Sequence, residues 1–365
     1  MGFKCGIVGL PNVGKSTLFN ALTQTAAAQA ANYPFCTIEP NVGEVAVPEP
    51  RLDLLARIAK SKEIIPARMS FVDIAGLVKG ASQGEGLGNQ FLGNIRETDA
   101  VVYVCRCFED GDVTHVTGRI DPLADLEIVE TELMLADLDS LERRRANVEK
   151  KAKGGDKESK EALTLIDAAR LALEAGKPAR SVPIPPDQQK AWRMLQLLTA
   201  KPVLFIANVD EASAASGNAL SAMVEARAQT EGAHAVVISA KIEAELALLS
   251  PAESQEFLET LGLEEPGLNK VIRAGYGLLG LATYFTVGPK EARAWTIHVG
   301  DTAPQAAGVI HTDFEKGFIR AETIAFDDFI ACNGEVGAKE AGKMRLEGKE
   351  YLVRDGDVMH FRFSG

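Results

Sequence analysis

The chain has 365 residues and a mass of 39.0 kDa, about twice the commonest domain size, so two or three compact units are expected. Apolar residues make up 46% and charged residues 25% of the sequence, which excludes a disordered, collagen-like or coiled-coil-dominated chain. The net charge of −12 at pH 7 disfavours unselective binding to nucleic acid or anionic lipid, so a nucleic-acid partner would need a local basic patch.

The amino terminus and the cysteines indicate the compartment. The first residues, MGFKCGIVGL, lack the charged and apolar regions of a signal peptide, and no stretch reaches the roughly 18 apolar residues of a membrane span. The five cysteines are scattered and show no C-x-x-C spacing, so we expect reduced thiols and no zinc site. The protein is therefore expected to be cytoplasmic and to have no membrane partner.

Short apolar runs alternate with helical segments through much of the chain. Residues 3–8 form an apolar run that ends at Gly9, typical of a buried strand entering a tight turn, and a helix is expected to begin at Ser16. Further buried strands are expected at 67–76, 100–108, 202–209 and 235–240. The alternation predicts an α/β fold with a doubly wound, mainly parallel sheet.

A long charged stretch without strand character, residues 121–199, separates two of these strands. Apolar residues recur in it at spacings of three and four, with an interruption at Gly154-Gly155. This pattern predicts an antiparallel helical hairpin of the coiled-coil type. Two interpretations stay open: a solvated arm that packs only on itself, and a lever or docking arm that uses Arg143–Arg145 and the lysines near its tip.

The last ninety or so residues consist of short alternating runs separated by glycine and aspartate. These runs lie at 283–288, 292–300, 317–324 and 349–364. They are too close together for another parallel α/β unit, so we expect a separate β-rich module that begins near Leu278. The predicted domains are therefore 1–120 with 200–277, a helical insert at 121–199, and a C-terminal module at 278–365.

The strongest chemical signal is GLPNVGKST, residues 9–17, which matches the phosphate-loop pattern G-x-x-x-x-G-K-[ST] between an expected strand and an expected helix. Glycines let successive backbone N–H groups face a phosphate. Lys15 is expected to neutralise the β- and γ-phosphates, and Ser16 to offer its hydroxyl to Mg²⁺. The loop predicts a P-loop NTPase, and Asn12 makes K⁺ a second candidate ion.

Three further positions complete the predicted phosphate and metal site. Asp73 ends the strand expected at 67–76 and is predicted to orient Mg²⁺, with a helix N-cap as the alternative role. Gly76 is expected to offer a backbone N–H to the γ-phosphate. Thr37 lies where the switch segment of GTPases delivers a threonine to Mg²⁺.

The base-recognition region departs from the guanine-specific pattern Asn-Lys-x-Asp. The four residues from Asn208 to Glu211 read N-V-D-E, so Val209 replaces the stacking lysine and Glu211 replaces the guanine-reading aspartate. Discrimination for guanine is therefore weakened, and ATP is the predicted nucleotide. Ser239 lies where GTPases supply a backbone contact to the base.

The residues around the γ-phosphate predict slow turnover. Leu77 follows DIAG where Ras-like enzymes have a glutamine that orients water, and a leucine cannot do so. His115 lies in an acidic loop and is a candidate for orienting water or sensing the γ-phosphate; the alternative is a loop histidine bonded to neighbouring carboxylates. The glycine-rich residues 77–96 are predicted to be a switch segment.

Together these motifs resemble the YchF or Obg-like ATPase family, in the Obg branch of the translation-factor class of P-loop GTPases. The resemblance covers essentially the whole chain and rests on GLPNVGKSTLFNAL, NYPFCTIEPN, DIAGLVKGAS, the segment 115–122, the N-V-D-E variant and the closing β-rich module. It implies a nucleotide domain with a coiled-coil helical insert, followed by a TGS domain of ubiquitin-like β-grasp form.

The resemblance also implies an activity and its residues. It implies slow, Mg²⁺-dependent hydrolysis of ATP in preference to GTP, and association with the ribosome through its subunits, rRNA or ribosomal proteins. It places Mg²⁺ on Ser16 and Thr37, and adenine near Asn208 and Val209. The ATP phosphates fall on Asn12, Val13, Gly14, Lys15, Ser16 and Thr17. We expect a monomeric, nucleotide-switched factor in translation or stress response; the alternatives are a GTPase proper and a non-catalytic nucleotide-sensing adaptor.

Overall fold

The computed structural model describes residues 3–30, 41–74, 87–110 and 119–364, without the side chains of 26–30 and 87–90. Contacts divide the chain into two units. The first consists of residues 1–43 and 70–271, and the second of 44–69 and 272–365. Residues 44–69 were expected in the first domain, because no pattern in the sequence indicates that they group with 272–365. The three-domain division itself stays a prediction.

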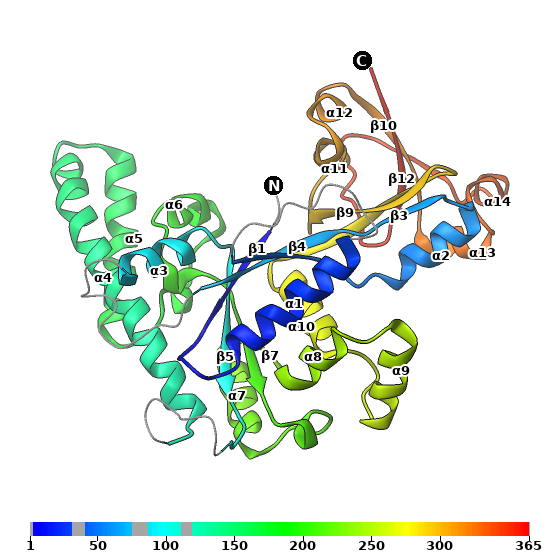
Figure 1. Ribbon diagram of the computed structural model, residues 1–365. Coiled ribbons are helices and arrows are strands. Elements are labelled where there is room, and N and C mark those ends of the chain that lie inside the picture. The colour runs from blue at the N-terminus through cyan, green and yellow to red at the C-terminus, as the bar shows by residue number, and fades with distance from the viewer. Residues whose placement is uncertain (1–2, 31–40, 75–86, 111–118, 365) are drawn as a thin grey trace. The chain divides into compact units, whose positions relative to one another are not determined.

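The first sheet has six strands in the order β2-β4-β1-β5-β6-β7. β1 pairs in parallel with β4 and β5, β5 with β6, and β6 with β7, which confirms the predicted doubly wound, mainly parallel sheet (Figure 1). All seven residues of β5 are buried, as expected for a strand covered on both faces. The strands are β1 (Lys4–Val8), β2 (Val42–Ala46), β4 (Arg68–Asp73), β5 (Ala100–Arg106), β6 (Val203–Asn208) and β7 (His234–Ile238).

Helices cover both faces of this sheet. Strand order reverses at β1, so right-handed connections place the helix after β1 and the helix after β6 on opposite faces. Accordingly, α1 packs on α8, whereas α7 packs on α4. The helices are α1 (Lys15–Ala30), α3 (Leu87–Arg96), α7 (Ala219–Thr230), α8 (Ala240–Leu246), α9 (Pro251–Thr260) and α10 (Gly267–Leu278). The carboxyl ends of β1 and its neighbours form the edge at which such sheets bind ligands.

The predicted helical hairpin is present as α4 (Pro122–Lys153) and α5 (Lys157–Glu174), which lie side by side and extend away from the sheet (Figure 1). Asp156 begins α5 by accepting the Ser159 N–H at 2.9 Å. Leu141, Ile166 and Trp192 are buried in a core that belongs to the arm. The arm continues through α6 (Gln189–Arg193) and the 3₁₀ helices Ala179–Ser181, Pro186–Gln188 and Leu198–Ala200; another 3₁₀ helix, Glu211–Ser213, follows β6.

The second unit contains a mixed six-stranded sheet in the order β11-β10-β12-β8-β9-β3, which confirms the β-rich module. The strand expected throughout 349–364 is confined to its last third, because β12 begins only at Val358. The elements are α2 (Pro50–Ala59), β3 (Glu63–Ile65), β8 (Leu281–Val287), β9 (Glu291–His298), α11 (Ala303–Ile310), α12 (Thr312–Lys316), β10 (Phe318–Ile324), α13 (Phe326–Ala331), α14 (Glu335–Glu340), β11 (Arg345–Glu347) and β12 (Val358–Phe363).

Residues 44–69 join this unit through a strand pair: β3 runs parallel to β9, with Glu63 opposite Glu291. The module is therefore completed by a segment more than two hundred residues earlier in the chain. Across the parts of the chain that the structure describes, no helix combines the length and the apolar character needed to cross a membrane.

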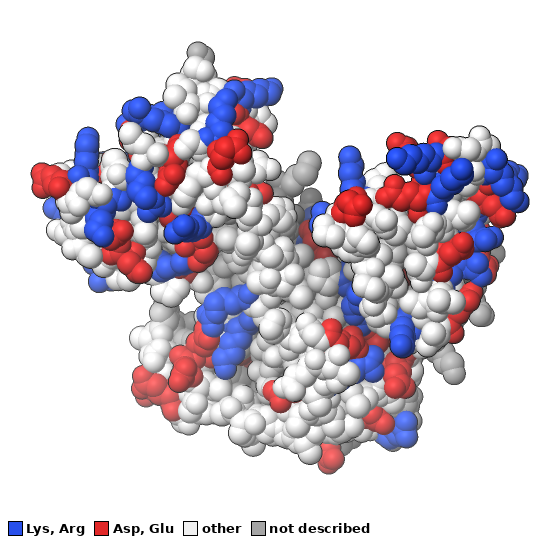
Figure 2. Space-filling model, turned by 180° about the vertical axis from the view of Figure 1, so that it is seen from behind, with Lys and Arg blue, Asp and Glu red and all other residues white. Residues whose placement is uncertain are grey.

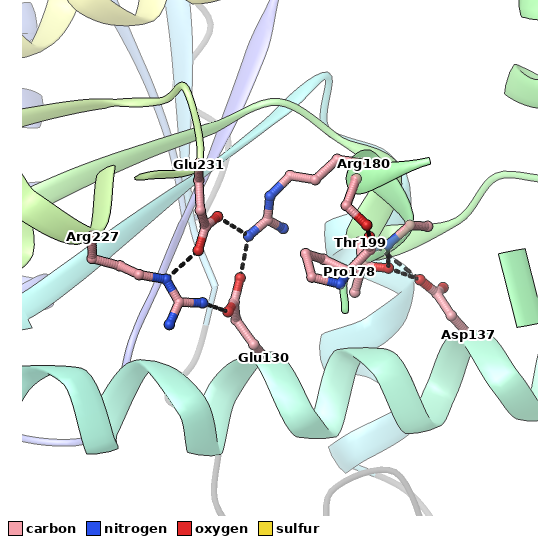
Figure 3. Close-up of polar contacts among 9 residues, drawn as sticks. Glu130, Asp137, Pro178, Arg180, Thr199, Arg227 and Glu231 are labelled. Atoms are coloured by element: carbon pink, nitrogen blue, oxygen red, sulfur yellow. Dashed lines mark hydrogen bonds and ion pairs between the residues drawn. The ribbon is translucent and has the colours of Figure 1, made fainter. Parts of the chain in front are cut away.

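A cluster of buried and partly buried charged side chains joins the base of the arm to α7 (Figure 3). Arg180 donates to Glu130 of α4 and, at 2.6 Å, to Glu231, while Arg227 donates to both carboxylates. Burial would raise the pKa of Glu231, but the hydrogen bonds and charges of the two arginines lower it. Two anions and two cations thus balance each other in a protected site.

About two turns further along α4, Asp137 is 1% exposed, and its carboxylate accepts hydrogen bonds from a second segment (Figure 3). Its carboxylate accepts the Leu198 and Thr199 N–H groups at 2.8 Å each, and the Thr199 hydroxyl at 2.7 Å. Thr199 in turn accepts the Ala179 N–H at 3.0 Å. The Asp137 carboxylate therefore accepts hydrogen bonds from two backbone N–H groups and one hydroxyl of the segment that returns from the arm to β6.

The first prediction concerns Asp137→Ala, which leaves two buried N–H groups without an acceptor. We expect the free energy of unfolding to fall by about 2–4 kcal/mol, measured by urea denaturation. Asp139→Ala is the control, because Asp139 forms only an exposed pair with Arg143 and its loss should cost about 0.5 kcal/mol or less. Equal losses for the two variants would contradict this role of Asp137.

Candidate nucleotide-binding site

The loop between β1 and α1 has the backbone that a phosphate cradle requires. Gly14 has φ of 96° and Asn12 has φ of 63°, conformations open to glycine and tolerated by asparagine. A Cβ atom on Gly9 would lie 2.7 Å from the Val104 carbonyl oxygen, so only glycine fits there. The exposed Ser16 and Thr17 stand at the start of α1, where helix N–H groups lack intrahelical partners.

Lys15 is the charged centre of this loop. It is 7% exposed, and its Nζ donates to the Leu10 carbonyl at 3.1 Å. Burial lowers the pKa of Lys15, and the nearby carboxylate of Asp73 offsets only part of this effect. Within the described part of the chain, the Lys15 ammonium donates to one carbonyl, so this buried cation is well placed to take an anionic partner.

Asp73 ends β4 beside Lys15. Its Oδ1 is buried and has no hydrogen-bond partner among the residues that the structure describes. Burial raises the pKa of Asp73, and the charge of Lys15 offsets part of the rise. Mg²⁺ prefers oxygen ligands, and a hydroxyl at the helix start with a carboxylate of unmet capacity matches that preference. The residues present therefore fit a magnesium ion that accompanies a phosphate group.

Three predicted residues cannot be placed in this geometry. Thr37, Gly76 and His115 lie outside the described residues, as does Leu77. Their roles toward Mg²⁺, the γ-phosphate and water stay predictions, and so does the switch role of 77–96, of which 77–86 lie outside the described residues and 87–96 form α3. The N-cap alternative for Asp73 and the role of Asn12 toward K⁺ also stay predictions.

Asn208 connects the phosphate loop to the predicted base site. Its side chain is 4% exposed; Nδ2 donates to the Val13 carbonyl and Oδ1 accepts the Ala240 N–H, both at 2.9 Å. One amide thus joins the loop after β1, the end of β6 and the start of α8. Gly14 is in contact with the same amide, where a Cβ atom would clash, which explains why this position needs glycine.

The residues that follow Asn208 do not present a free guanine-reading carboxylate. Glu211 pairs with Lys241, whose hydrogen bond lowers the pKa of Glu211. Asp210 is also engaged, because its side chain accepts the Ser213 N–H at 2.9 Å. The only carboxylate at the position of the guanine-specific aspartate is therefore held by a cation.

Val209 and Ser239 lie below the surface of this region. Val209 is 2% exposed and its N–H donates to the Ile238 carbonyl at 2.8 Å. Ser239 is also 2% exposed, and its hydroxyl has no partner among the described residues. Contact of either residue with a base stays a prediction.

The sequence analysis missed two contacts in this site. The amide of Asn208 reaches a carbonyl 195 residues away, and Lys241, for which no role was expected, pairs with Glu211. Neither contact has a local signal, because each depends on which strand ends lie side by side. The strand order was the only information that could have suggested them.

The cysteines of the first sheet are structural. Cys5 and Cys107 are buried, and burial raises the pKa of each thiol to about 12. At neutral pH they are protonated and unreactive.

Two protein families match the chain. MMR_HSR1, described as "50S ribosome-binding GTPase", matches residues 4–136. YchF-GTPase_C, described as a protein of unknown function, matches residues 281–364. One match contains the phosphate loop and the other the C-terminal sheet, so both units have counterparts in known families.

Full-length relatives agree with these matches. The chain is 61% identical over 364 residues to the ribosome-binding ATPase YchF of Haemophilus influenzae and 54% identical over 366 residues to that of Bacillus subtilis, and each alignment covers 100% of both chains. A structure titled Schizosaccharomyces pombe YchF GTPase matches with a TM-score of 0.89 and 38% identity, over 99% of this chain and 98% of that one. The similarity therefore extends to the fold of the whole chain.

The second prediction concerns the amide that positions the phosphate loop. Asn208→Ala leaves the Val13 carbonyl and the Ala240 N–H without partners, so we expect Mg²⁺–ATP affinity to fall at least about tenfold and the free energy of unfolding to fall by about 1–3 kcal/mol. Calorimetric titration and urea denaturation measure the two effects.

Asn218→Ala is the matched control. Asn218 accepts the Leu220 and Ser221 N–H groups and donates to the Cys107 carbonyl, but it begins α7 on the face opposite α1. We expect a similar loss of stability with affinity unchanged within about twofold. Equal losses of affinity in both variants would show that Asn208 has no specific effect on the loop.

Proposed function

Because the chain belongs to the YchF family, we propose that it is a ribosome-binding ATPase that binds ATP with Mg²⁺ and hydrolyses it slowly to ADP and phosphate. The observation that carries the proposal is the buried ammonium of Lys15 near the half-buried Asp73 at the phosphate loop, together with an Asp73 Oδ1 that has no hydrogen-bond partner among the described residues. A triphosphate would supply the negative charge that Lys15 lacks, and Mg²⁺ the positive charge that Asp73 lacks.

The loop residues hold the phosphates. Backbone N–H groups from Val13 to Thr17 and the start of α1 face the anion, and Lys15 compensates its charge. Ser16, Asp73 and Thr37 are the proposed residues around Mg²⁺. When bound, Mg²⁺ neutralises phosphate charge and orients the phosphate oxygens.

Adenine is the proposed base. Guanine selection requires an acceptor for the N1–H and N2–H groups, and Glu211 is longer than aspartate and paired with Lys241. The relatives from Haemophilus influenzae and Bacillus subtilis are named ATPases, which supports this choice. A GTPase proper is the second candidate, because the Schizosaccharomyces pombe structure is titled a GTPase.

Slow hydrolysis follows from the residues beside the γ-phosphate. Water must attack the γ-phosphorus in line with the leaving ADP, and Leu77 has no group that can hydrogen-bond to this water. His115 is the proposed water-orienting residue, and the Gly76 N–H is the proposed contact to the γ-phosphate. Leu77 also favours the other alternative, a non-catalytic nucleotide-sensing adaptor, whose phosphate release would not exceed that of Lys15→Ala.

Ribosome binding comes from the names of the relatives. We propose that this chain acts as a monomer in the cytoplasm, as a nucleotide-switched factor in translation or stress response. The bound nucleotide would select between two arrangements of the switch segments and thereby control the affinity for the ribosome.

The third prediction tests the nucleotide. ATP should bind at least about tenfold more tightly than GTP in calorimetric titrations with Mg²⁺, and Lys15→Ala should abolish binding of both, because each unit charge at the phosphates contributes strongly in a buried site. Lys177→Ala, which removes an exposed lysine of the arm, should leave both affinities unchanged. Tighter binding of GTP would replace the ATPase proposal by the GTPase.

The fourth prediction tests the proposed water-orienting residue. His115→Ala should lower the rate of phosphate release from ATP about 10²-fold or more, with ATP affinity changed less than about threefold, because general catalysis acts on turnover. His234→Ala, at an exposed position of β7, should have the parent rate. Equal losses of rate and affinity, or no loss, would remove His115 from the mechanism.

A further inference from the structure

The distal part of the arm carries a charge opposite to that of the chain. We call residues 143–161 the arm tip; it contains the end of α4, the turn and the first residues of α5. Its eight lysines and arginines outnumber its four acidic residues, which gives a net charge of +4 in a chain whose net charge is −12. Figure 2 shows these side chains gathered at the upper end of the right-hand lobe, among a few acidic ones.

Only some of these cations have a structural partner. Arg143 pairs with Asp139, Arg145 with Asp167 and Glu149, and Lys153 with Glu149. Four exposed lysines form no ion pair with any residue that the structure describes; they are Lys150, Lys151, Lys157 and Lys160. Lys151 acts on the pKa of Asp156 only at longer range.

The helix dipole accounts for the positions of two of these four lysines. Lys150 and Lys151 lie in the last turn of α4, where the helix dipole favours cations. Lys157 and Lys160 lie at the amino end of α5, where the dipole disfavours them, and they add to the positive charge of α4 across a short turn. Among the described residues no ion pair compensates for this arrangement, and an external anion would.

Resting on the proposed ribosome binding, we propose that the arm tip is an RNA-docking surface at which these four lysines contact the phosphate backbone of ribosomal RNA. Lysines release counterions from RNA phosphates on binding, and they need no particular base sequence. Duplex RNA offers phosphates along both edges of its wide minor groove.

The negative charge of the rest of the chain favours binding of RNA at the arm tip rather than at other surfaces. Outside the arm tip the chain is strongly acidic, so its other surfaces are repelled by a polyanion as a whole, while the tip is attracted. The arm is anchored at its base by the partly buried ion pairs of Glu130 and Glu231 with Arg180 and Arg227. The lysines are thus presented at the far end of an element whose base is fixed to α7.

The experiment compares the full-length parent with a variant that carries Lys150→Gln, Lys151→Gln, Lys157→Gln and Lys160→Gln. Glutamine keeps helix propensity, and circular dichroism verifies that the hairpin is folded. Two probes are used: a fluorescent RNA duplex of about 20 base pairs, followed by anisotropy, and purified ribosomes, followed by co-sedimentation. Both titrations are repeated between about 50 and 200 mM KCl.

The variant should bind the duplex at least about tenfold more weakly at the lowest salt, and its plot of log affinity against log salt should lose about 3 from its slope, since each phosphate contact contributes roughly 0.7–0.9. Ribosome affinity should fall in parallel. A second variant neutralises the same number of charges in the other unit through Lys290→Gln, Lys316→Gln, Lys339→Gln and Lys349→Gln, and should match the parent within about twofold.

Unchanged duplex affinity and salt slope in the arm-tip variant would overturn the proposal. It would also be overturned if ribosome binding fell while neither protein bound the duplex, because the partner would then be an acidic ribosomal protein. The proposed function is tested separately: it would be wrong if the parent neither sedimented with ribosomes nor released phosphate from ATP. The duplex titrations would still show whether the arm tip binds RNA.

Discussion

The side-chain amide of Asn208 is the contact on which the nucleotide site depends. It holds the carbonyl of Val13 and the N–H of Ala240, so the phosphate loop, the end of β6 and the start of α8 keep one relative position. An amide can do this because it offers a donor and an acceptor from one planar group. The loop that would grip the phosphates and the segment that would contact the base are therefore positioned by the same residue.

Charged side chains differ in burial and in pairing at three places in the first unit. At the base of the arm, two guanidinium groups that are partly buried balance the buried Glu130 and the partly buried Glu231. At the phosphate loop, Lys15 is buried, and the half-buried Asp73 has an Oδ1 without a hydrogen-bond partner among the described residues. At the arm tip, four exposed lysines form no ion pair within the part of the chain that the structure describes. Balanced burial fits a structural joint, whereas unmet charge fits binding.

The effect of replacing the guanine-reading aspartate by Glu211 depends on the residues around Glu211. A glutamate in place of the guanine-reading aspartate could still accept hydrogen bonds if it were free. Lys241 binds that carboxylate, and Asp210 caps the following turn, so neither acid stands unengaged beside the base site. The pair is exposed and contributes little to stability, and in this arrangement the Glu211 carboxylate is already engaged by a cation.

The sequence alone determined the strand-loop-helix unit at residues 3–30, the parallel sheet, the helical hairpin and the β-rich module, because hydrophobic periodicity and glycine positions act locally. It also identified Lys15 and Asp73, since the phosphate-loop pattern and the strand ending at Asp73 are local signals. Only the tertiary structure decided that β3 completes the second sheet, that the Asn208 amide donates to the Val13 carbonyl, and that Lys241 forms an ion pair with Glu211. These contacts join residues tens to hundreds of positions apart, and their geometry arises only when the strands are ordered side by side.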